Sequence, residues 1–84
     1  MHKNIMTKKQ IEKMFNNMKN DCECVKSLYD KNFYNIEQTM KQIGDYENDY
    51  MHCVNALLLF DMIDDKIHDY AYELLNEFEI KFFE

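Results

Sequence analysis

The chain has almost none of the residues that form tight turns. It contains one glycine and no proline in 84 residues. Folds rich in β-strands need Gly, Pro or Asn-Gly turns roughly every 8–12 residues, and this sequence cannot supply them. The sequence therefore predicts an all-α fold.

Arginine is absent, and acidic residues outnumber lysines. Residues 1–41 carry eight lysines against five acids, whereas residues 42–84 carry two lysines against eleven acids. Bidentate recognition of phosphate and guanine depends on arginine, and an acidic half repels nucleic-acid backbones. We therefore expect no direct binding to nucleic acid.

The sequence also lacks long apolar runs. No stretch of about 18 uncharged apolar residues is present, so no membrane span is expected. The N-terminal segment MHKNIMTKKQ has no apolar region of the kind found in secretory signals. Three cysteines are an odd number, and without a secretory signal they are expected to stay free thiols. These features predict a cytoplasmic protein.

Apolar residues make up 46% of the chain, which is enough for one folded domain over residues 1–84 with a small core. In the first half they recur at helical spacing after Thr7, which with Gln10 forms a capping box. The residues of this seam are Ile11, Phe15, Met18, Cys22, Val25 and Tyr29. The spacing slips at residues 30–32, where the helix either breaks or continues through a stutter.

Gly44 lies near the middle of the chain, and the segment GDYEND is predicted to be a loop. Gly44 would be the residue that ends one helix, and Asn48 or Asp49 would cap the next. Beyond it, the segment ALLLF, residues 56–60, is apolar on all sides and should be covered on several of them. Two models fit: a small antiparallel bundle of three to four helices, with turns near residues 30–32 and 64–65, or a long αα-hairpin that dimerises.

No constellation of catalytic residues is evident. His52 and Cys53 are adjacent in the sequence, but adjacent residues on a helix do not face each other. We therefore expect a protein that is not an enzyme and needs no cofactor. The cluster Asp61, Asp64, Asp65 and His68 could offer ligands to a divalent ion, but it lacks the paired motifs of helical metal sites. A small metal-binding helical protein is the weakest of the alternatives.

The most unusual feature is a row of acids at every fourth position, formed by Asp61, Asp65, Asp69, Glu73 and Glu77. On a helix this spacing places like charges next to each other. Asp64 and Tyr72 lie beside this row, and an exposed tyrosine among acids suits a protein interface. The candidate partner-binding residues are Asp61, Asp64, Asp65, Asp69, Tyr72, Glu73 and Glu77.

The row has two competing interpretations. If the chain folds back at Gly44, lysines of the first half neutralise it. The pairs expected are Lys26 with Asp61, Lys19 with Asp69, Lys13 with Glu73 and Glu77, and Lys9 with Glu79.

Alternatively, the row faces outward and imitates a phosphate backbone, because its acids are about 6 Å apart along the helix. The protein would then bind the basic surface of a protein partner and regulate or inhibit it, in the manner of small phage inhibitors of restriction or CRISPR enzymes. The alternative from another class is a structural homodimer without an inhibitory role.

Overall fold

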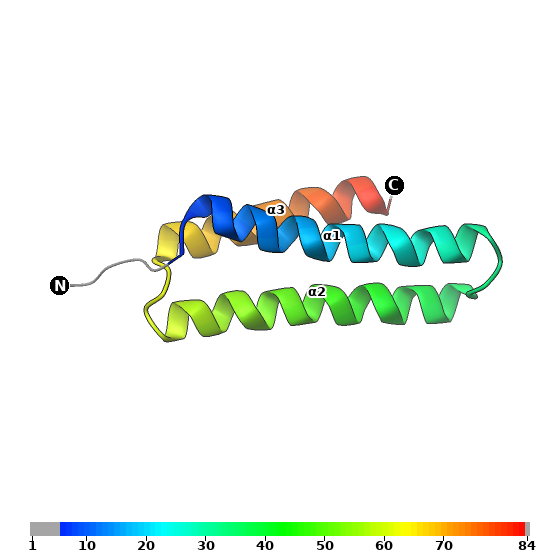
Figure 1. Cartoon of the computed structure of the whole chain (residues 1–84), viewed down its shortest axis with the longest axis horizontal. Coiled ribbons are helices and arrows are strands. Elements are labelled where there is room, and N and C mark those ends of the chain that lie inside the picture. The colour runs from blue at the N-terminus through cyan, green and yellow to red at the C-terminus, as the bar shows by residue number, and fades with distance from the viewer. Residues whose placement is uncertain (1–5, 84) are drawn as a thin grey trace.

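The computed structural model describes residues 6–83, and within that range it consists of three α-helices. These are α1 (Lys8–Asp30), α2 (Ile36–Leu59) and α3 (Asp65–Phe82). Figure 1 shows the helices side by side, with α1 and α3 running in one direction and α2 in the other. The bundle measures 53 × 19 × 15 Å. The predicted small all-α bundle is confirmed, and the alternative of one long hairpin is excluded because the chain turns twice.

Capping boxes start the first two helices. The Thr7 hydroxyl accepts a hydrogen bond from the N–H of Gln10 at 3.3 Å, and the Gln10 side chain accepts one from the N–H of Thr7 at 2.8 Å. Asn35 and Gln38 exchange the same two bonds at the start of α2. The capping box predicted at Thr7 is therefore confirmed, and the one at Asn35 has the same spacing in the sequence.

The first two helices end without glycine. Asn32 and Asp61 take the left-handed conformation, with φ of 67° and 59°. After Asn32, the next N–H donates to the carbonyl of Leu28 at 2.9 Å, and after Asp61 the next N–H donates to the carbonyl of Leu57 at 2.8 Å. This is the Schellman pattern, and Asn and Asp tolerate the left-handed region better than other residues with a side chain. The helix therefore breaks at residues 30–32.

The loop predicted at Gly44 is wrong. Gly44 lies inside α2, and so do Asn48 and Asp49, which therefore cap no helix. A Cβ atom added at Gly44 would meet nothing within 4 Å, so no close contact requires a glycine there. Glycine inside a helix costs about 1 kcal/mol relative to alanine, and burial of Ile43 and Tyr50 on either side of this segment offsets that cost.

The core runs along the line where the three helices meet. Its buried residues form one cluster: Ile11, Phe15, Met18, Cys22, Val25, Ile43, Tyr50, Val54, Ile63, Ile67, Ala71, Leu75 and Phe78. The ring of Phe15 packs edge-on against Tyr50 and Phe78, with centroids 5.8 and 5.9 Å apart. The Tyr50 hydroxyl donates to the carbonyl of Ala71 at 3.0 Å and so joins α2 to α3.

The segment ALLLF is covered less than expected. Leu57 and Leu58 are half-buried, but Leu59 and Phe60 are 79% and 72% exposed. They lie where α2 ends, and a helix in a three-helix bundle buries only the side that faces its two neighbours. The prediction that this segment is covered on several sides is therefore wrong. None of the helices within residues 6–83 combines the length and hydropathy needed to cross a membrane.

Candidate functional site

The acidic row is shorter on the helix than the sequence pattern suggests. Asp61 lies in the turn before α3, where its left-handed backbone closes α2. Asp65, Asp69, Glu73 and Glu77 lie on α3, and all four are exposed. We refer to these four residues as the acidic ridge. At a rise of 1.5 Å per residue, the ridge spans about 18 Å.

The ridge winds around α3, because a step of four residues turns about 40° past a full circle. Its last member, Glu77, therefore lines a groove of about 400 Å³ between α1 and α3 together with Lys19, Lys26 and Lys81. Asp69 belongs to the part of the ridge before Glu77, and its side chain is 80% exposed. The first three acids are exposed to solvent. Glu77 is also exposed but shares the lining of this groove with three lysines.

The predicted neutralising pairs are wrong, because α3 runs parallel to α1 and the chain does not fold back at Gly44 (Figure 1). The pairs concerned are Lys26 with Asp61, Lys19 with Asp69, Lys13 with Glu73 and Glu77, and Lys9 with Glu79. The ammonium of Lys26 instead lies 5.2 Å from the centroid of the Phe82 ring. No lysine within residues 6–83 comes within 4.0 Å of a ridge carboxylate.

A further acid, Glu12 of α1, lies against the flank of the ridge. The Tyr70 hydroxyl donates a hydrogen bond to the Glu12 carboxylate. This bond, with partial burial and the negative charges of Glu12, Glu77 and Glu73, raises the pKa of Tyr70 to about 12. The ammonium of Lys8 lies 5.0 Å from the centroid of the same ring. The sequence pattern missed Glu12, because only the parallel packing of α1 and α3 brings it beside the ridge.

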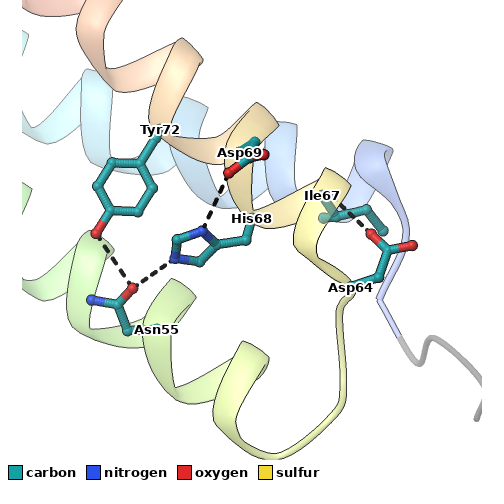
Figure 2. A network of polar contacts seen from close by, with 6 residues as sticks. All are labelled: Asn55, Asp64, Ile67, His68, Asp69 and Tyr72. Atoms are coloured by element: carbon teal, nitrogen blue, oxygen red, sulfur yellow. Dashed lines mark hydrogen bonds and ion pairs between the residues drawn. The ribbon is translucent and has the colours of Figure 1, made fainter.

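A polar network beside the ridge joins α3 to α2 (Figure 2). His68 Nε2 and Asn55 Oδ1 are 2.8 Å apart, and the Tyr72 hydroxyl donates to the same oxygen at 3.4 Å. Since that oxygen only accepts, Nε2 carries the proton. The His68 and Tyr72 rings lie 4.7 Å apart, and His68 Nδ1 lies 3.9 Å from Asp69. Tyr72, predicted to be an exposed anchor, is 37% exposed and held by its hydroxyl against α2.

Asp64 serves the helix itself. It is half-buried, and its Oδ1 accepts the N–H of Ile67 at 2.9 Å, which caps the start of α3 (Figure 2). His68, four residues on, is turned toward Asn55. Within residues 6–83 no three side chains of the His, Cys, Asp or Glu type gather where they could hold a metal ion.

All three cysteines are free thiols. Cys22 is buried in the core, as the apolar seam predicts, and Cys24 and Cys53 are exposed. Burial, followed by the negative charges of Glu47, Asp21 and Glu23, raises the pKa of Cys22 to about 12, so that this thiol stays neutral. A neutral, enclosed thiol is a poor nucleophile.

Comparisons of the chain with protein families, with curated proteins and with solved structures find no match.

Proposed function

We propose that the protein binds a basic surface on a protein partner through the acidic ridge. The observation that carries the proposal is a row of exposed carboxylates with no lysine of residues 6–83 within 4.0 Å. Like charges one helical turn apart cost roughly 0.2–0.5 kcal/mol per pair. A basic partner would remove that cost on binding.

The chemistry of the ridge resembles that of a nucleic-acid strand. Its acids repeat about every 6 Å along α3, which is comparable with the spacing of phosphates along a winding strand. A partner whose groove normally holds DNA or RNA would meet a similar line of negative charge. The protein would then inhibit that partner by competition, as phage inhibitors of restriction or CRISPR enzymes do.

Apolar side chains at the same end of the bundle support a protein partner. Leu59 and Phe60 are exposed at the end of α2, just before the turn that leads to Asp65. Apolar and aromatic side chains anchor protein interfaces, while charges steer the approach of the partner. The proposal places the protein in the cytoplasm, where its free thiols stay reduced.

The test starts from affinity capture in the native host and continues with the purified partner. Binding should weaken steeply as NaCl rises from about 0.05 to 0.5 M, because salt screens exposed charges. The double variant Asp65→Lys with Asp69→Lys should lose about tenfold or more in affinity. A labelled DNA or RNA substrate of the partner should be displaced by the wild-type protein and not by this variant.

A matched control is Asp30→Lys with Asp45→Lys, which changes the charge equally at two exposed acids away from the ridge. This control should keep nearly full affinity. Circular dichroism should show that both variants stay helical. Equal affinity of the wild type and the ridge variant would contradict the proposal.

The structural homodimer is a second candidate, and one surface favours it. The turn between α1 and α2 extends beyond the end of α3, as Figure 1 shows. Tyr29, Phe33, Ile36 and Met40 are exposed at this end. Light scattering should show a dimer that survives about 1 M salt if this apolar surface is an interface, because salt does not weaken apolar contacts. A monomer would rule this candidate out.

A further inference from the structure

Two half-buried carboxyl groups lie close together between α2 and α3. Glu47 is half-buried, and its Oε2 is closed off from solvent with no hydrogen-bond donor among residues 6–83. The carboxyl of Glu79, also half-buried, lies within hydrogen-bonding reach of the Glu47 side chain. A buried polar atom without a partner is unusual in a folded protein and demands an explanation.

Among residues 6–83, no cation forms an ion pair with either carboxyl group. The residues three and four positions away on the same helices carry no charge at neutral pH: Ile43, Gly44, Tyr50 and Met51 around Glu47, and Leu75, Asn76, Phe82 and Phe83 around Glu79. From α1 the titratable neighbour is the buried thiol of Cys22, which stays neutral. No lysine within residues 6–83 lies within 4.0 Å of either carboxyl. Two ionised carboxylates in this position would repel each other at close range.

We propose that Glu47 and Glu79 share one proton, and that this proton clamps the second half of α3 to α2. The protonated carboxyl donates an O–H to the other carboxylate, which gives the buried Oε2 its missing partner. When the proton leaves, two negative charges face each other and the C-terminal part of α3 loosens. The first half of α3 stays attached to α2 through two contacts. The Tyr50 hydroxyl bonds to the carbonyl of Ala71, and His68 bonds to Asn55.

The direction of the pH dependence follows from the environment of Glu47. Burial, then the hydrogen bond to Glu79 and the negative charge of Glu79, raises the pKa of Glu47 from about 4.5 to about 7. A raised folded-state pKa means that the contribution to stability is complete below about pH 4.5 and is lost as pH rises through about 7. The clamp therefore closes on acidification and opens on the alkaline side of neutral.

The direct test is a carbon NMR titration of the glutamate side-chain carboxyls in the full chain. One proton should leave the pair with a midpoint near pH 7, and both carboxyl signals should move in that step. The alternative outcome, in which both carboxyls finish titrating below about pH 5.5, would overturn the proposal.

Amide hydrogen exchange tests whether the shared proton holds the second half of α3 against α2. After correction for the intrinsic pH dependence of exchange, amides of residues 75–82 should lose about tenfold in protection between pH 6 and pH 8. Amides of residues 65–72 should lose much less. Equal loss along the whole of α3 would show that the pair does not act as a local clamp.

Two substitutions separate a shared proton from simple packing. Glu47→Gln keeps the shape and donates a permanent N–H to Glu79, so protection of residues 75–82 should no longer change between pH 6 and pH 8. Glu79→Lys offers a cation to Glu47, so protection should rise with pH instead of falling. Glu23→Gln, an exposed glutamate on α1, is the control and should behave as the wild type. A wild-type pH response in Glu47→Gln would refute the shared proton.

Discussion

Helix α3 carries two kinds of carboxylate that behave differently. The acids of the ridge keep their water, and Asp69 is 80% exposed. Glu79, ten residues further along the same helix, lies half-buried against Glu47 and shares its environment. The difference shows that the face of the helix decides whether an acid stays in water or lies against another carboxyl group. The exposed acids stay in contact with solvent. In the enclosed pair, two ionised carboxylates would repel each other.

The largest expected effect comes from opening the enclosed pair to water. Leu75 is buried one turn before Glu79, and Leu75→Ala should cost about 2–5 kcal/mol in the free energy of unfolding, measured by urea denaturation. Water entering the cavity should also lower the pKa of Glu47 toward its ordinary value. Leu74→Ala, a half-buried position in the groove on the α1 side, is the control and should leave that pKa raised. An unchanged Glu47 titration in Leu75→Ala would contradict the role of burial.

Two adjacent acids give a sharper contrast within the acidic segment. Asp64 caps α3 through the N–H of Ile67, so Asp64→Ala should destabilise the fold by about 1 kcal/mol. Asp65 is exposed on the ridge, and Asp65→Ala should change stability by no more than about 0.5 kcal/mol. Thermal unfolding followed by circular dichroism measures both. Equal losses in the two variants would mean that capping does not distinguish them.

Gly44 lies one turn before Glu47 and offers a stabilising change. Because a Cβ there meets nothing within 4 Å, Gly44→Ala should stabilise the protein by about 0.5–1 kcal/mol. The pKa of Glu47 should stay raised, since the substitution adds no charge and opens no cavity. A loss of stability in urea denaturation would show that this position needs glycine for a reason other than space.

The smallest effect is expected from the ridge itself. Asp69→Asn with Glu73→Gln removes two neighbouring negative charges, and stability at low salt should rise by a few tenths of a kcal/mol. The gain should disappear in about 1 M NaCl, because the repulsion it relieves is screened. Denaturation curves at low and high salt provide the comparison. A gain that persists at high salt would have to come from something other than charge.

Several features of the fold could be predicted from local patterns. The capping box at Thr7 and the burial of Cys22 follow from spacing along one helix. The slip in spacing at residues 30–32 left open whether the helix breaks there or continues through a stutter. The second capping box, at Asn35 and Gln38, carries the same signal and could have been found in the same way. Gly44 misled the prediction, because a glycine ends a helix only when the left-handed conformation is needed, and here the helix continues.

The candidate site depends on contacts that no local pattern contains. Glu12 reaches Tyr70 across 58 positions of sequence, and Glu47 meets Glu79 across two helices. Both contacts require that the chain turn at residues 31–35 and 60–64 and that α3 run parallel to α1. A turn at Gly44 instead predicts a pair between Lys9 and Glu79, and within residues 6–83 no lysine lies within 4.0 Å of Glu79.

Helix type, helix starts and the spacing of the acidic row are encoded locally, because hydrogen bonds and side-chain contacts within a helix join residues three or four apart. The environment of each acid is not encoded in that way. It depends on which helices pack together and in which direction, and that choice minimises the free energy of the whole apolar core. Tertiary packing therefore leaves the ridge in water and encloses Glu47 with Glu79.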